Sequence, residues 1–219
     1  MPTPILAIVG TATLAIALAG CGETTPEAAE PAAAVDAAES TAPPTDAEPA
    51  PAALPAGALA LDTASSKVDF TGAKITAKHQ GGFERIEGFA TLDGVTVTAL
   101  EVTVHTASVW TDGSDRLTAH LRDADFFDAA NHPTATFAAT ELKPLDGGEA
   151  THRVTGDLTL RGVTKTLTFD ATLAVNDGEV LGKATFPIDR QDYGIAYPGK
   201  PDDLIKDEVE LRLDLTFRV

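Results

Sequence analysis

The sequence predicts an all-β domain of eight antiparallel strands, and three observations carry this prediction. Apolar and polar residues alternate with a period of two in eight runs, as in strands that have one buried and one exposed face. Turn sequences such as Asp93–Gly94 separate the runs. The clearest helical spacing lies in one short stretch, 112–123. Eight such strands can pack as a sandwich or close into a barrel, and we favour the barrel because closure removes exposed sheet edges.

The first three strands are predicted over 67–78, 86–92 and 100–104. The first is bent at Gly72, and Gly81 and Gly82 form the turn that follows it. The period then changes, because Leu117 and Leu121 are four residues apart. A short helix between the third and fourth strands is therefore expected, with Asp112 or Ser114 as its N-cap.

The remaining five strands follow the helix. The fourth is predicted over 135–139, and the hairpin 156–173 supplies the fifth and sixth around a turn at Arg161 and Gly162. The seventh covers 180–188. A loop over 189–206 is long enough to be functional. The last strand, 208–219, has the most regular alternation in the chain.

The N-terminal part has a different composition. An apolar run over 5–20 ends at the only cysteine, Cys21, and is short for a membrane span, so residues 1–20 are predicted to be a signal peptide. From Gly22 to Gly57 the chain is rich in Ala, Pro and acidic residues and has no aromatic or basic residue. Residues 21–58 are therefore predicted to be a disordered acidic linker, and 59–219 the folded domain.

Three blocks resemble one known family. They are RLTAHLRDADFFDAANHPTATF at 116–137, GDLTLRGVTKTLTF at 156–169 and FPIDRQDYGI at 186–195. The blocks are similar to the YceI-like family of lipocalin-like, polyisoprenoid-binding barrels, and the resemblance covers 59–219. It implies a long barrel that binds an isoprenoid quinone or a prenyl phosphate.

A second resemblance concerns the apolar run. Leu18, Ala19, Gly20 and Cys21 resemble the bacterial lipobox, in which a diacylglyceryl group is attached to the cysteine sulfur. This implies an extracytoplasmic lipoprotein, anchored at Cys21 and facing the periplasm or the cell surface. The run lacks the Lys or Arg that usually precedes it, so a plain secretory signal or an uncleaved anchor is the alternative.

Small residues occupy many inward positions of the predicted strands, such as Gly88, Gly156 and Gly182. Because the side chains of an eight-stranded barrel can just fill its interior, so many small residues predict an apolar channel; the alternative is that the glycines mark bends. Phe126 and Phe127 are predicted to plug one end. The predicted apolar lining is Phe70, Ile86, Ala90, Val102, Phe126, Phe127, Phe137, Leu158, Leu160, Phe169, Ala171, Ala184 and Phe186.

A lipid head group needs a polar mouth. The candidates are Arg116, His120 and Arg122 near the helix, and Arg190, Tyr193 and Tyr197 in the long loop. The predicted function is the sequestration or transport of a polyisoprenoid. The alternative is a stalked β-sandwich that binds a protein through its loops, with a filled interior; any protein partner is unknown.

Other function classes have little support. The net charge is −17, so no basic stripe is available for nucleic acid. The five histidines show none of the close spacings of a zinc site, and no serine lies in a nucleophile elbow. His105 is predicted to be a solvated histidine on the outer face of the third strand. We expect no catalytic residue, no metal and no catalytic cofactor.

Overall fold

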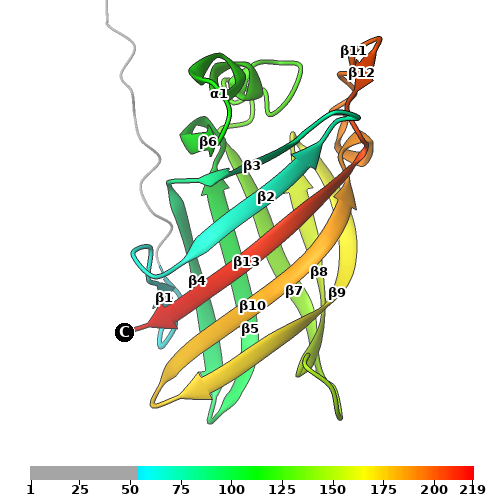
Figure 1. Ribbon diagram of the computed structural model, residues 1–219. Helices are drawn as coiled ribbons and strands as arrows, with labels where there is room; N and C mark the ends of the chain where they lie inside the picture. The colour runs from blue at the N-terminus through cyan, green and yellow to red at the C-terminus, as the bar shows by residue number, and fades with distance from the viewer. Residues whose placement is uncertain (1–53) are drawn as a thin grey trace, which may run out of the picture. The chain divides into compact units, whose positions relative to one another are not determined.

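The computed structural model describes residues 54–219. The predicted signal peptide, Cys21 and most of the predicted linker lie outside these residues. Figure 1 shows the described part as strands wrapped around one axis, with a single α-helix above them. The strands are β1 (Leu59–Leu61), β2 (Lys67–Ala73), β3 (Lys78–Phe83), β4 (Ile86–Asp93), β5 (Thr96–His105), β6 (Val109–Thr111), β7 (Thr134–Pro144), β8 (His152–Leu160), β9 (Val163–Asn176), β10 (Glu179–Asp189), β11 (Gly199–Lys200), β12 (Asp203–Leu204) and β13 (Glu208–Arg218).

The sheet closes on itself, because β13 pairs with β10 on one side and with both β1 and β2 on the other. β1 and β2 therefore share one strand position, and β3 with β4 and β5 with β6 share the next two. The result is eight strand positions, each antiparallel to its neighbours. This confirms the predicted closed eight-stranded antiparallel barrel with one short helix between the third and fourth positions.

Three neighbouring strand positions are interrupted at the same level, over 62–66, 84–85 and 106–108. Hydrogen bonds join the interruptions: the Glu84 amide donates to the Ser108 carbonyl over 3.1 Å, and the Arg85 amide to Ser108 Oγ over 3.0 Å. The Thr216 amide donates to Ser66 Oγ over 2.9 Å. These bonds satisfy backbone groups that the broken ladders leave without a strand partner. The barrel wall bends along this line.

The predicted first strand and turn need a correction. Residues 74–77 turn the chain, so 67–83 is the hairpin of β2 and β3, and Gly81 and Gly82 lie inside β3. A Cβ at Gly81 would lie 2.4 Å from Phe70 Cζ, so the glycine makes room for the Phe70 ring. The two glycines that suggested a turn therefore lie within a strand, and Gly81 leaves room for the Phe70 ring.

Helix α1 (Asp115–Arg122) confirms the predicted change of period. Ser114 is its N-cap, and its hydroxyl accepts a hydrogen bond from the Leu117 amide over 3.3 Å. Asp115 in the first turn and Arg122 in the last carry charges that suit the helix dipole. Leu121 is the buried residue of the helix and packs into the upper end of the barrel.

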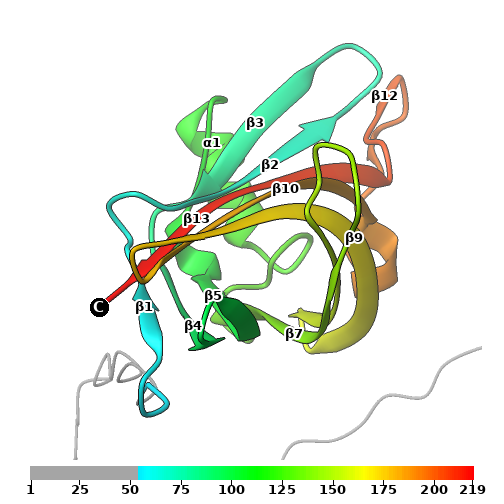
Figure 2. The ribbon, with the colours of Figure 1, turned by 90° about the horizontal axis from the view of Figure 1, so that it is seen from below.

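The end of the barrel away from α1 is densely packed, and we call it the closed end. Ala90, Val180 and Phe217 are 0% exposed there. Phe217 lies opposite Val180 in one ladder and opposite Leu61 in another, while Leu59 lies opposite Ala90. Figure 2 looks along the barrel from this side, where β1 and the end of β13 lie next to each other.

Candidate functional site

An apolar cavity of about 200 Å³ lies inside the barrel, between the closed end and α1. Strands on all sides contribute to its wall, which is almost wholly hydrocarbon. Eleven of the predicted lining residues lie on this wall: Phe70, Val102, Phe126, Phe127, Phe137, Leu158, Leu160, Phe169, Ala171, Ala184 and Phe186. Ile86 and Ala90 are buried in the core but do not line the cavity. The binding role of all thirteen stays a prediction.

The small inward residues have two different roles. Gly182, Ala171 and Ala184 lie on the cavity wall, as a channel requires. At Gly88, however, a Cβ would lie 2.3 Å from the Glu101 carbonyl oxygen, and at Gly156 it would lie 2.4 Å from Phe137 Cζ. These two glycines allow close approach of a backbone and of a ring, so the inference of empty space was wrong at both positions.

Two groups of aromatic rings stand in the wall. Phe169 stacks on Phe186 with ring centroids 3.8 Å apart, and Phe137 adjoins Phe169 at 5.6 Å. Under α1, the Phe70, Phe83 and Phe127 rings pack with centroids 5.4 Å to 6.1 Å apart. Phe126 and Phe127 both line the cavity, and their predicted role as a plug stays a prediction.

The cavity wall lacks a side chain at Gly72. Gly72 in β2 lines the cavity, yet a Cβ at this position would meet nothing within 4 Å. Phe70 lies two residues earlier on the same strand face, and the next turn, 74–77, ends the wall. We call this opening the mouth. Gly72 was predicted only to bend the first strand, since a glycine beside open space has no sequence signature distinct from a bend.

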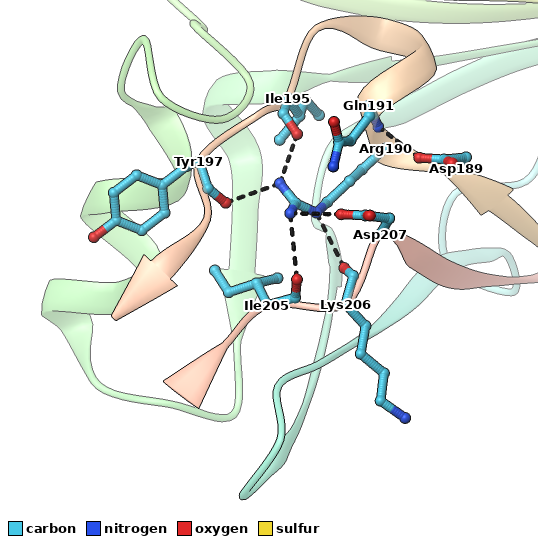
Figure 3. A network of polar contacts seen from close by, with 8 residues as sticks. All are labelled: Asp189, Arg190, Gln191, Ile195, Tyr197, Ile205, Lys206 and Asp207. Atoms are coloured by element: carbon cyan, nitrogen blue, oxygen red, sulfur yellow. Dashed lines mark hydrogen bonds and ion pairs between the residues drawn. The ribbon is translucent and has the colours of Figure 1, made fainter. Parts of the chain in front are cut away.

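Arg190 organises the long loop beside the mouth (Figure 3). Its guanidinium donates to the carbonyls of Ile195 at 2.6 Å, Tyr197 at 2.9 Å, Ile205 at 3.3 Å and Lys206 at 3.0 Å, and to Asp207 Oδ1 at 2.9 Å. A guanidinium has five N–H groups, so the loop occupies all of them. We therefore assign Arg190 to holding the loop in place rather than to a ligand head group.

Tyr193 does not lie at the mouth either. It lies in the 3-10 helix Arg190–Tyr193, is 1% exposed and does not line the cavity. Its hydroxyl has no hydrogen-bond partner among the described residues. Burial, with a smaller contribution from Asp192, raises the pKa of Tyr193 to about 12. The side chain acts as a core residue with an unsatisfied hydroxyl.

The long loop is fastened on two sides. On one side the His120, Phe126 and Tyr197 rings pack together with centroids 5.0 Å to 5.4 Å apart. On the other, Asp203 accepts hydrogen bonds from Lys74 Nζ at 2.5 Å and from the amide and hydroxyl of Thr76 at 3.1 Å and 3.0 Å. The bond from Lys74, with those from Thr76, holds the pKa of Asp203 below its usual value.

The other predicted mouth residues lie on or near α1. His120 Nε2 is 3.0 Å from Asp125 Oδ2, and Arg122 donates to the Val109 carbonyl over 3.1 Å. Arg116 is exposed on the helix. Of the six candidates, Arg190 and Tyr193 are buried, whereas Arg116, His120, Arg122 and Tyr197 are exposed or half-buried. Their role in binding stays a prediction.

His105 contradicts its prediction. It is buried, and its Nε2 lies 2.8 Å from Glu87 Oε1, so it is not a solvated histidine. It is the last residue of β5, where the strand position breaks. Within residues 54–219 no group of three or more His, Cys, Asp or Glu side chains could hold a metal ion. None of the helices described is long and apolar enough to cross a membrane.

Comparison with known proteins gives a consistent result. The family model of the YceI-like domain matches residues 59–217. A UPF0312 protein of Pseudomonas putida (strain W619) is 39% identical over 127 residues, which cover 54% of this chain and 65% of that protein. Protein YceI of Escherichia coli O157:H7 is 44% identical over 95 residues, 42% of this chain and 48% of its own. The matched stretch is therefore less than two thirds of each relative.

Two solved structures share the fold. The crystal structure of Burkholderia cenocepacia BcnA is 26% identical, with a TM-score of 0.63, and the match covers 71% of this chain and 98% of that one. A structure described as a polyisoprenoid binding domain from Saccharophagus degradans is 18% identical, with a TM-score of 0.59, covering 74% and 98%. At this low identity the second likeness concerns the fold alone.

Proposed function

This chain belongs to the YceI-like domain family, and from that premise we propose that its barrel binds a polyisoprenoid, such as an isoprenoid quinone or a prenyl phosphate. One observation carries the proposal: the interior cavity is lined almost wholly by hydrocarbon, and at Gly72 its wall lacks a side chain. Burying a hydrocarbon tail there removes apolar area from water, at about 25 cal/mol per Å². Binding by this means needs no catalytic group, so we propose a binding protein rather than an enzyme.

The size of the cavity bears on how the ligand enters. Ligand pockets usually measure about 300–1,000 Å³, and this cavity, at about 200 Å³, is smaller. A long tail must therefore displace side chains. The Phe70 ring, which lies two residues before Gly72 on the same face of β2 and packs against Phe83 and Phe127, is next to the mouth. The polar head would remain outside the cavity, where Arg116 and His120 on α1 are candidates to contact it.

The location of the protein is a further part of the proposal. We propose that Cys21 is lipidated and that the linker tethers the barrel outside the cytoplasm. The spacing from Cys21 to Leu59 would allow a flexible chain to span about 30–40 Å. Palmitate labelling of the full chain, with Cys21→Ser as the control, tests this directly; equal labelling of both would exclude the anchor.

The experiment for binding is organic extraction of the purified full chain followed by mass spectrometry, with uptake of an isoprenoid quinone from detergent as a second readout. Ala171→Phe and Gly182→Phe place a ring in the cavity and are expected to abolish uptake. Thr172→Phe lies on the same strand as Ala171 but faces solvent, and should bind normally. Normal uptake by both cavity variants would overturn the proposal.

The alternative, a stalked module that binds a protein through its loops, predicted a filled interior. The cavity argues against it, because a purely structural core is packed without voids of this size.

A further inference from the structure

The two segments next to the mouth form a surface that the cavity does not require. They are the turn and strand start 74–78 and the hairpin 199–206, and together we call them the tip. The Ile75 amide donates to the Leu204 carbonyl over 3.2 Å, the Lys206 amide to the Ala73 carbonyl over 2.8 Å, and Lys74 pairs with Ile205 in a β-bridge. Figures 1 and 2 both show the end of the β2–β3 hairpin beside β12.

The tip exposes two large aliphatic side chains. Ile75 is 67% exposed and Leu204 is 46% exposed, although the hydrogen bonds above hold their backbones together. Their neighbour Ile205 lines the cavity, as does Gly72 at the mouth. Apolar surface therefore continues from the interior of the barrel, past the mouth, to the outermost residues of the tip. Single exposed aliphatic residues need no explanation, but two that are joined at the rim of an apolar cavity do.

The charge of the tip differs from that of the rest of the chain. The chain carries a net charge of −17, yet the tip holds four lysines, at 74, 78, 200 and 206, against two aspartates, at 202 and 203. Lys74 is paired with Asp203. Lys78, Lys200 and Lys206 make no ion pair with any described residue, and Figure 3 shows the Lys206 side chain directed away from the Arg190 network. These three ammonium groups are free to meet anions.

We infer that the tip docks on the surface of an anionic lipid bilayer. Ile75 and Leu204 enter the boundary between head groups and acyl chains, while Lys78, Lys200 and Lys206 meet lipid phosphates. This orientation turns the mouth toward the membrane, so that a tail can pass from the bilayer into the cavity along apolar surface. The inference rests on the proposed function, and it adds the surface at which ligand is exchanged.

The chain allows a local test, because Cys21 is its only cysteine. In the full chain with Cys21→Ser, a single cysteine at Ile75 or Leu204 is labelled with the environment-sensitive dye NBD. Val95, which is 79% exposed in the turn between β4 and β5 at the closed end, provides the matched control. Vesicles of phosphatidylethanolamine and phosphatidylglycerol should shift the emission to the blue at Ile75 and Leu204 but leave it unchanged at Val95.

Variants separate the two contributions to docking. Ile75→Asp with Leu204→Asp is expected to weaken binding of the Cys21→Ser chain to these vesicles at least about ten-fold, since each buried aliphatic side chain contributes substantially. Val95→Asp should leave binding unchanged. Each of the three lysines is expected to contribute about five-fold on anionic vesicles, an effect that salt reduces. Neutral phosphatidylcholine vesicles should bind weakly.

The failures of this inference and of the proposed function are distinguishable. If the tip docks, the double aspartate variant transfers an isoprenoid quinone slowly from vesicles but takes it up normally from detergent. An NBD response that is absent at Ile75 and Leu204, or equal at Val95, would overturn docking at the tip and point to a protein partner or to the N-terminal segment. If the unmodified chain takes up no isoprenoid quinone from detergent, the proposed function is overturned instead.

Discussion

At the closed end of the barrel, Ala90, Val180 and Phe217 have no contact with solvent, whereas at the mouth Arg190 gathers five hydrogen bonds around one guanidinium. The closed end is stabilised by dense packing, which is non-directional and depends on buried area. The mouth is stabilised by directional bonds that fix a loop without filling the space beneath it. A barrel that must stay hollow can concentrate packing at one end and use hydrogen bonds at the other.

The largest expected change in stability concerns the closed end. Phe217→Ala should lower the free energy of unfolding by about 3–5 kcal/mol, since it removes a fully buried ring and leaves a cavity. Chemical denaturation measures this change. Val219→Ala, two residues later and exposed, is the control and should change stability by no more than about 0.5 kcal/mol. A loss below about 1 kcal/mol for Phe217→Ala would show that the closed end does not dominate stability.

The second prediction tests the mouth. Arg190→Met should lower the free energy of unfolding by about 2–3 kcal/mol, because it removes charged hydrogen bonds to four carbonyls and Asp207. Native-state trypsin cleavage after Lys206, which is exposed and followed by Asp207, should accelerate. Arg190→Lys should restore little, since an ammonium group cannot reproduce the planar donor geometry. Unchanged resistance to trypsin would mean that the ring contacts of Tyr197 suffice to hold the loop.

Two buried valines allow the packing of the closed end to be compared with that of the cavity wall. Val180 lies at the closed end, and Val102 lies on the cavity wall. Val180→Ala should cost about 2 kcal/mol, but Val102→Ala only about 1 kcal/mol, because its methyl groups already face partly empty space. Both values come from the same denaturation experiment. Equal costs would indicate that the cavity is closed in solution.

The smallest effect concerns Tyr193. Tyr193→Phe should stabilise the protein by about 1 kcal/mol, because it removes a buried hydroxyl that lacks a partner. The substitution should also change how the free energy of unfolding depends on pH. The pKa of Tyr193 is raised from 10.0 to about 12 in the folded state, so above pH 10.0 the unfolded state loses its proton first. This group therefore leaves the free energy of unfolding unchanged below pH 10.0 and lowers it as the pH rises through about 12. Tyr193→Phe should lack this fall of stability at alkaline pH when thermal unfolding is followed as a function of pH. If the fall is the same in the variant, another group causes it.

The fold was predictable because the alternation of side chains is a local property of each strand. In β13, for example, every second residue is apolar, and the sequence alone assigns these residues to one face. The breaks at 62–66, 84–85 and 106–108 were not predicted, since their bonds join residues far apart in the chain. The same limit applies to Arg190: its partners are mostly backbone carbonyls, which have no signature in sequence.

The cavity was partly predictable for a similar reason. A run of small inward residues in β9 and β10 indicated space correctly at Ala171, Gly182 and Ala184. At Gly156 the same signal had another cause, because the Phe137 ring from the adjacent strand covers the glycine. Composition along one strand cannot show what the neighbouring strand contributes, and a cavity is defined by both.

The pairing of β1 with β13 has a practical consequence. It places Ala60 opposite Arg218, so both ends of the barrel domain emerge side by side at the closed end, away from the mouth. A short peptide could join these ends, and new ends could be opened at the exposed turn around Val95. A circularly permuted barrel, or one inserted into a loop of a host protein, should keep its interior accessible from the opposite side.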